Sequence, residues 1–353
     1  MDKHTKLDFN GQTIYIGIDV HKKHWTITIL SQHLEHKTFT QPPQVSKLVK
    51  YLHRNFPGAT YLAVYEAGFC GFWIHDQLQQ QGVKCWVVNP ADVPTTNKEK
   101  RRKKDVVDSR KLAHRLRSHE LQAIYVPTPS QMQDRGLVRT RQSMVRKQTR
   151  CKNQITSILF LHGISIPESG RWSRRFISEL EQIPMLRASG DILLKMHLEE
   201  LAHLRHIIAS LNKAIRDLSR SEPYRENVRL LKTIPGISTL TAMTLLTELC
   251  DINRFKNLDH LCSFVGLVPD TASSGDSETI CGLTPRQNKL LRAMMIQASW
   301  VAVGKDPALM MAFHTLALRM KKTKAIIRIA RKLLNRIRYV LKNQQNYEFL
   351  VAA

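Results

Sequence analysis

Four acidic residues have the types and the spacing to hold a divalent cation. Asp19 and Glu66 each lie at the end of an apolar run, and Asp105 and Asp108 open a helix-like segment. A carboxylate that closes a buried strand is costly unless its charge is compensated, so two such strands and a helical pair indicate a shared cation. Residues three apart on a helix lie within roughly 60° of each other around its axis, which lets Asp105 and Asp108 face one ion.

All four of these donors are oxygens, which suits Mg²⁺, with Mn²⁺ as an alternative, because both are hard cations that phosphate oxygens also bind. The four residues therefore predict a metal site that cuts or joins nucleic acid. Each of them alone has a simpler role open to it. Asp105 in particular could serve only as the N-terminal cap of its helix.

A second chemical candidate is the serine pair Ser273 and Ser274, which Gly275 follows. The pair lies in a stretch that reads as a loop, ahead of a helix expected from about residue 285. Ser-Gly pairs are common in loops, so only their context gives these serines a catalytic role.

The charge balance indicates a polyanionic partner. The chain of 353 residues has 54 Lys and Arg against 29 Asp and Glu, a net charge of +25. A field of this sign attracts nucleic acid, whose counterions are released on binding. With 42% hydrophobic residues the chain is not a disordered basic tail, and its length predicts two or three domains.

Cysteine usage and the start of the chain indicate a reducing compartment. The six cysteines include no C-x-x-C pair and no His at zinc-finger spacing, so they indicate neither a disulfide framework nor a structural zinc. The polar start lacks an apolar signal region, and no run of about 18 apolar residues occurs. We therefore expect a bacterial-type cytoplasmic, nucleoid-associated protein without a membrane partner.

The order of elements in residues 1–126 predicts a mixed α/β domain. Strands are expected over 15–31 as a hairpin, 36–40, 61–66 and 83–88, with helices over 45–52, 72–81 and 105–118. Three leading strands followed by alternating helices and strands form a mixed sheet flanked by helices. This is the order of a ribonuclease-H-like fold.

Residues 127–222 predict a long helical arm, with helices over about 131–161 and 191–219. The second helix carries heptads, with Leu194, Leu201, Ile208 and Ile215 in one register and His197, Leu204, Leu211 and Leu218 in the other. This pattern favours a coiled-coil arm or a dimer seam. Packing of the two helices within their own domain is the alternative.

Residues 223–353 predict a third, mostly helical domain. Its segment Ile234-Pro235-Gly236-Ile237 resembles the turn of a helix-hairpin-helix, which presents backbone N–H groups to phosphate; an ordinary turn is the alternative. Helices are expected over about 285–303 and 325–341. The second carries Arg328, Arg331, Lys332, Arg336 and Arg338. We interpret these residues as a phosphate-facing surface, with a solvated face as the alternative.

In order and spacing, these motifs resemble the DEDD transposases of bridge-RNA-guided insertion sequences, whose first half is RuvC-like. The motifs of the first half are Gly17-Ile18-Asp19-Val20-His21-Lys22, Tyr65-Glu66-Ala67-Gly68 and Lys104-Asp105-x-x-Asp108-Ser109-x-Lys111-Leu112-Ala113. Those of the second half are Ile234-Pro235-Gly236-Ile237, Phe255-Lys256, Gly266-Leu267-Val268-Pro269 and Ser273-Ser274-Gly275. The resemblance spans nearly the whole chain.

The resemblance implies a recombinase that cleaves and rejoins DNA strands to move its own insertion element. It implies that Asp19, Glu66, Asp105 and Asp108 hold Mg²⁺. It also implies that Ser274 attacks a DNA phosphate to form a phosphoserine link, with Ser273 as the rival nucleophile.

The partners that the resemblance implies are double-stranded donor and target DNA and a structured non-coding guide RNA. A homodimer or tetramer would pair the acidic site of one subunit with the serine of another. One departure from the family is that a basic run does not follow the serine motif, because residues 276–279 are Asp-Ser-Glu-Thr. Local phosphate contacts would then fall to Arg286, Lys289 and Arg292.

Two other functions remain open at this point. A junction-resolving nuclease would use the four acids with water as the nucleophile and would form no protein-linked DNA. A non-catalytic RNA- or DNA-packaging protein would need only the basic charge. Its activity would survive Asp19→Asn, Asp105→Asn and removal of Mg²⁺, but it gives no reason for acids at two strand ends.

Overall fold

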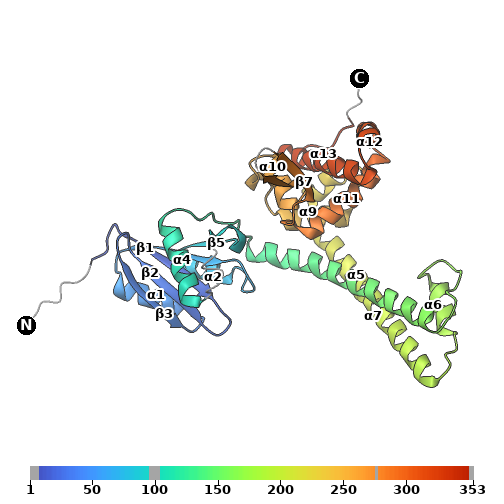
Figure 1. Ribbon diagram of the computed structural model, residues 1–353, viewed down its shortest axis with the longest axis horizontal. Coiled ribbons are helices and arrows are strands. Elements are labelled where there is room, and N and C mark those ends of the chain that lie inside the picture. The colour runs from blue at the N-terminus through green and yellow to red at the C-terminus, as the bar shows by residue number, and fades with distance from the viewer. Residues whose placement is uncertain (1–7, 95–103, 275–276, 350–353) are drawn as a thin grey trace, which may run out of the picture. The chain divides into compact units, whose positions relative to one another are not determined.

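The computed structural model describes residues 8–94, 104–274 and 277–349. The chain forms two compact units, Met1–Val126 and Pro127–Ala353, whose residues mostly contact residues of the same unit (Figure 1). Our three-part division into residues 1–126, 127–222 and 223–353 stays a prediction.

A five-stranded mixed sheet forms the first unit. Its strands lie in the order β3-β2-β1-β4-β5, with β1 antiparallel to β2 and parallel to β4. In chain order the elements are β1 (Thr13–Val20), β2 (Trp25–Leu30), β3 (Glu35–Gln41), α1 (Val45–Asn55), β4 (Thr60–Glu66), α2 (Trp73–Gln80), β5 (Lys84–Val88), the short η1 (Pro90–Asp92) and α4 (Asp105–Arg117). The predicted mixed sheet with flanking helices is confirmed.

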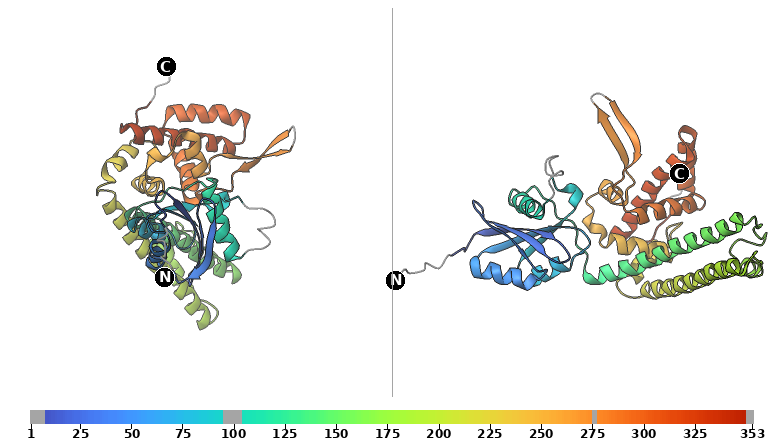
Figure 2. Two further views of the ribbon diagram at one scale, coloured as in Figure 1. Left: turned by 90° about the vertical axis from the view of Figure 1, so that its left-hand side faces the viewer. Right: turned by 60° about the horizontal axis from the view of Figure 1, so that its bottom comes forward.

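Helices cover both faces of this sheet because side chains alternate along its strands. Ile14, Ile16 and Ile18 of β1 are buried against α1 and α2, whereas Tyr15 packs with α4. Figure 2 shows α1 and α4 on opposite faces. At Gly17 the backbone of α4 comes so close that an added Cβ would lie 2.1 Å from the carbonyl oxygen of Ser109. This close approach holds the first turn of α4 beside the end of β1.

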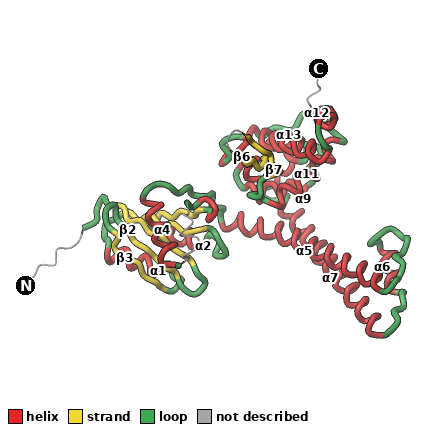
Figure 3. Tube along the Cα trace, in the orientation of Figure 1, coloured by secondary structure: helices red, strands yellow, loops and turns green. Residues whose placement is uncertain are grey.

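Helices make up most of the second unit. The helix α5 (Pro129–Leu161) and the helix α7 (Ala188–Leu218) lie side by side, with α6 (Arg174–Glu181) packed at their far end (Figure 3). The first predicted heptad register of α7 is buried throughout, while in the second only Leu204 is buried. The pairing of α7 with α5 is therefore intramolecular. A coiled-coil geometry stays a prediction.

The rest of the second unit packs around one long C-terminal helix. Its elements are α8 (Arg225–Leu231), α9 (Thr239–Leu249), the short η2 (Ile252–Arg254), α10 (Leu258–Val265), β6 (Pro269–Ser274), β7 (Ser277–Leu283), α11 (Lys289–Val303), α12 (Pro307–Arg319) and α13 (Lys322–Asn343). The predicted mostly helical character is confirmed. The helix expected from residue 285 begins only at Lys289, because the side chain of Asn288 caps it by accepting a hydrogen bond from the Leu291 N–H.

A buried ion pair ties α5 to α9. Glu248 is only 1% exposed, and its carboxylate accepts hydrogen bonds from Arg139 at 2.6 and 2.8 Å and from Asn288 at 2.8 Å. Burial alone would raise the pKa of Glu248, but the hydrogen bonds and charge of Arg139 outweigh it and hold that pKa below its ordinary value. The pair therefore stabilises the junction between these helices while Glu248 is ionised.

We expect Arg139→Met to destabilise the second unit by about 3 kcal/mol, because it leaves a buried carboxylate without its bidentate partner. Glu248→Gln should cost less, about 1–2 kcal/mol, since water can solvate the half-exposed Arg139. Because the pKa of Glu248 is lowered, the pair's stabilisation is present above the ordinary value of 4.5 and is lost as pH falls through the lowered pKa. Urea unfolding at neutral and acid pH measures both effects. A larger loss for the Gln variant would contradict this account.

Candidate metal centre

The carboxyl ends of β1 and β4 meet where α4 begins. Ile18 pairs with Tyr65 in the parallel register of these strands, so Asp19 and Glu66 follow at the same edge of the sheet. Both lie on the face that α4 covers, because they stand two residues beyond Gly17 and Val64, which face that helix. Strand register thus places Glu66 beside Asp19.

Asp105 and Asp108 occupy the first turn of α4. The N-terminal cap is Lys104, without a side-chain cap hydrogen bond, so the alternative in which Asp105 serves only as the cap is wrong. Carboxylates in a first helical turn interact favourably with the positive end of the helix dipole. The Nζ of Lys111 lies 3.7 Å from Oδ1 of Asp108.

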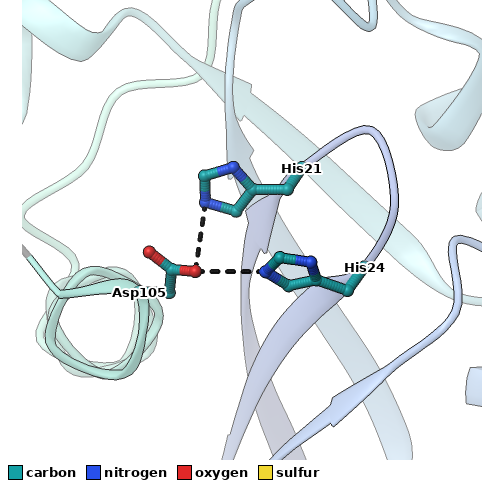
Figure 4. A group of neighbouring side chains, drawn as sticks. All are labelled: His21, His24 and Asp105. Carbon is teal, nitrogen blue, oxygen red and sulfur yellow. Dashed lines mark hydrogen bonds and ion pairs between the residues drawn. The ribbon is translucent and has the colours of Figure 1, made fainter.

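Two histidines of the β1–β2 turn reach the same place. His21 Nε2 lies 3.2 Å from Oδ2 of Asp19 and 3.4 Å from Oδ2 of Asp105. His24 Nε2 lies 3.2 Å from that same Asp105 oxygen, as Figure 4 shows. The two imidazole rings stack with centroids 5.1 Å apart. One ring therefore brings the carboxylates of Asp19 and Asp105 together.

The pKa values of Asp19 and Asp105 are shifted in opposite directions. Burial raises the pKa of Asp19; His21 opposes this shift, and the charges of Asp105 and Asp108 add to it. The hydrogen bond from His24 lowers the pKa of Asp105. Three acids whose charges act on one another at a strand end form a site that a cation stabilises.

The residues present fit a divalent cation. Asp19, Asp105 and Asp108 supply hard oxygen donors, and one ligand atom each from His21, His24 and Asp105 lies within 4.8 Å of the others. His21 already occupies the space between two carboxylate oxygens, which is where a positive charge is most favourable. Among the described residues, Asp105 is the one predicted acid in this group, so a cation held by all four acids would need Asp19, Glu66 and Asp108 to move closer to it.

His21 and His24 are the site residues that the sequence interpretation missed. Their segment, His21-Lys22-Lys23-His24, reads as a turn, and that is what it forms. The position of this turn could have indicated their role. The turn follows β1 directly, so its side chains lie near Asp19 at the end of that strand.

Two open pockets lie in the first unit, and one of them has Asp105 in its lining. One, of about 580 Å³, is lined by His24, Thr26, Thr40, Lys104, Asp105 and Val106. The other, of about 540 Å³, runs along α4 and has Arg110, Lys111, His114, Arg115 and Arg117 in its lining. Asp105 thus borders an open pocket, while cations along α4 pair with Glu35, Asp108 and Glu120.

The serine pair belongs to the second unit. Ser273 and Ser274 end β6, where Ser274 pairs with Ser277 of β7, so the predicted loop is a hairpin instead. Figure 2 shows this hairpin extending from the helices around it. Gly275 lies outside the described residues. Neither unit alone contains both the acids and the serines.

Several predicted phosphate contacts are used inside the protein. Arg331 pairs with Asp259 at 2.8 Å and Arg336 pairs with buried Asp306. Arg292 donates to the carbonyl oxygens of Gly266 and Thr284. Of the five cations predicted on α13 to face phosphate, Arg328 and Lys332 are exposed, and they lie one helical turn apart.

The turn predicted as a helix-hairpin-helix has a packing role. Gly236 has a φ of +86°, and an added Cβ would lie 2.4 Å from the carbonyl oxygen of Ala298 on α11. Only glycine fits this left-handed conformation against a neighbouring backbone. This packing explains the glycine, and a helix-hairpin-helix contact with phosphate stays a prediction for the turn between α8 and α9.

Across the described residues, every helix is too short or too polar to span a bilayer.

Comparisons with known proteins point to one family. The family model described as "Transposase IS116/IS110/IS902 family" matches residues 228–315, and a transposase model of the IS110 DEDD type matches residues 16–163. The putative transposase y4rJ of Sinorhizobium fredii is 27% identical over 91% of this chain and 90% of its own length. The match to y4qE of the same organism, 26% identical, covers 67% of this chain and 57% of that relative. The transposase for insertion sequence element IS1533 of Leptospira borgpetersenii is 27% identical over 70% of this chain and 72% of its own length.

Proposed function

Since the chain belongs to the IS116/IS110/IS902 family of transposases, we propose that it cleaves and rejoins the DNA strands of an insertion element and its target through a phosphoserine link. The observation that carries this proposal is the gathering of Asp19 and Asp105 around His21, with the charge of Asp108 close by. Such a site suits phosphoryl transfer, in which charge builds on the phosphate oxygens.

Asp19, Glu66, Asp105 and Asp108 hold the cation in this proposal. A bound Mg²⁺ would neutralise charge on the phosphoryl oxygens and lower the cost of deprotonating the attacking hydroxyl. Imidazole is a poorer ligand for Mg²⁺ than a carboxylate is, so His21 and His24 act as positioning residues that orient Asp19 and Asp105. Mn²⁺ would tolerate the same donors.

Ser274 supplies the nucleophile in this proposal, with Ser273 as its rival. Its hydroxyl oxygen forms a bond to phosphorus as the bond to the leaving deoxyribose oxygen breaks, and the proton lost by the serine ends on that displaced sugar oxygen as its hydroxyl. One phosphodiester replaces another, so no nucleotide is hydrolysed. Strand rejoining is the reverse reaction with a new sugar hydroxyl.

The acids and the serines lie in different units, and in this proposal a homodimer or tetramer on DNA pairs the acids of one subunit with the serine of another. The net charge of +25 supports double-stranded donor and target DNA and a structured guide RNA as partners. We assign the first unit a RuvC-like fold and the pair α5 and α7 a coiled-coil arm. With DNA as its partner, the protein is placed in the cytoplasm and associated with the nucleoid in this proposal.

RNA guidance is tested by recovering the nucleic acid that co-purifies with the protein and sequencing it. We expect a discrete, structured RNA transcribed from DNA that flanks the gene. Random cellular RNA in its place would refute RNA guidance. It would not bear on strand cleavage, which the assay with end-labelled DNA tests separately.

A further inference from the structure

A second group of metal-ligating side chains lies between the two long helices of the second unit. Cys151 of α5 faces His197 and Glu200 of α7, and one ligand atom from each lies within 4.8 Å of the others. We propose that these three residues bind one Zn²⁺ ion, which crosslinks α5 to α7. This site is independent of the acids at the end of β1.

The spacing of the donors suits a tetrahedral ion. His197 Nδ1 lies 3.6 Å from Oε2 of Glu200, and two ligands bound at the usual zinc distances are roughly 3.3 Å apart. The pair is three residues apart on one helix, so both side chains leave the same face of α7. Only small rotations of the side chains are needed to close this set around an ion.

Burial falls stepwise across the three ligands. Cys151 is 1% exposed, while the side chains of His197 and Glu200 are 22% and 52% exposed. The thiol therefore lies at the closed end of the site and the carboxylate at its open end. A water molecule can take the fourth position from the solvent side, as it does where a protein supplies three zinc ligands.

The thiol of Cys151 is protonated while no ion is bound. The Cys151 thiol donates to the carbonyl oxygen of His197 at 3.3 Å. Burial, together with the carboxylate of Glu200, raises the pKa of the thiol to about 11, so the metal-free site keeps its proton. Zinc binding forms the Zn–S bond and releases this one proton to water.

The donor set decides which ion is bound. Thiolate and imidazole are ligands for zinc and poor ligands for Mg²⁺, so this site and the acidic site take different metals. Cys151 and His197 are 46 residues apart. This separation is far outside zinc-finger spacing, so the sequence alone indicates no structural zinc and the proposed site depends on the packing of α5 against α7.

The test uses the full-length protein after chelation, titrated with Co²⁺ as a spectroscopic substitute for Zn²⁺. We expect one equivalent to give a thiolate-to-cobalt charge-transfer band and tetrahedral d–d bands, both displaced by Zn²⁺. Cys151→Ser should remove the charge-transfer band. Cys262→Ser is the matched control and should keep it, because Cys262 is equally buried and joins no such group among the residues that the structure describes.

Glu200→Gln covers the case in which Cys151→Ser fails to fold, since Glu200 is half exposed and its replacement leaves the helix intact. We expect it to weaken Co²⁺ binding by at least about tenfold, the lower bound for losing even an outer-sphere partner. Asp105→Asn should leave the charge-transfer band unchanged. A wild-type protein without that band, or a band that survives Cys151→Ser, would overturn the proposal.

Discussion

Asp19→Asn is expected to lower the rate of DNA strand cleavage by about 10³-fold or more, which corresponds to roughly 4 kcal/mol of activation free energy. Asn keeps the size and hydrogen-bonding reach of the side chain and removes its charge. The charges of His21, Asp105 and Asp108 all act on the pKa of the Asp19 carboxylate. Its charge therefore contributes directly to holding the cation, and the loss should appear in catalysis rather than in folding.

The measurement is single-turnover cleavage of end-labelled element DNA by the purified protein with its co-purified nucleic acid, at several Mg²⁺ and Mn²⁺ concentrations. The matched control is Asp76→Asn, because Asp76 also pairs with a histidine, His75, at 3.0 Å. That pair lies on α2, on the opposite face of the sheet from α4. We expect the control to cleave at close to the wild-type rate. Wild-type cleavage by the Asp19 variant, or cleavage without any divalent ion, would exclude a metal-dependent role for this cluster.

Much of this site could be predicted from the sequence because strand ends and helix starts are local features. Asp19 closes an apolar strand, and parallel pairing of β1 with β4 follows from the order of elements, so placing Glu66 at the same edge needed no coordinates. The two histidines are different. A turn sequence predicts that the chain reverses, but it does not predict where the side chains of the turn point. The direction of His24 depends on its contact with Asp105 of α4, which lies 81 residues further along the chain.

The roles of the arginines could not be predicted for a similar reason. Arg331 lies on the amphipathic helix α13 with the spacing of a basic surface, yet its guanidinium pairs with Asp259, 72 residues away. An isolated sequence does not show which exposed-looking cation has an internal acceptor. The phosphate-facing surface predicted on α13 is consequently smaller in the structure than in the sequence.

The hairpin around the serines was missed because its residues rarely form strands. The strand β6 has the sequence Pro-Asp-Thr-Ala-Ser-Ser, in which only Thr271 has a high strand propensity. Its pairing with β7 supplies the structure that its composition does not. The consequence is that Ser274 ends a strand rather than lying within a loop, so its backbone is held in register with Ser277.

Ser274→Ala is expected to abolish the covalent protein–DNA adduct. Alanine lacks the hydroxyl oxygen that would bond to phosphorus, and removal of a nucleophile has no partial substitute when water cannot form a protein-linked product. The assay incubates end-labelled DNA with the protein, denatures the mixture and separates it on a gel. The adduct is the labelled band whose slow mobility is lost on protease treatment.

Ser273→Ala is the matched control, because Ser273 is the adjacent residue of the same strand and the rival nucleophile. We expect it to keep the adduct. The reverse pattern would assign the nucleophile to Ser273. Cleavage that continues in both variants, with no adduct in the wild-type protein, would instead support a junction-type nuclease in which the four acids activate water.

A mixture of the two inactive variants tests whether the acids and the serine act between subunits. Asp19→Asn mixed with Ser274→Ala should restore adduct formation if the acids of one subunit work with the serine of another. The mixture should form no adduct if each subunit uses only its own acids and serine.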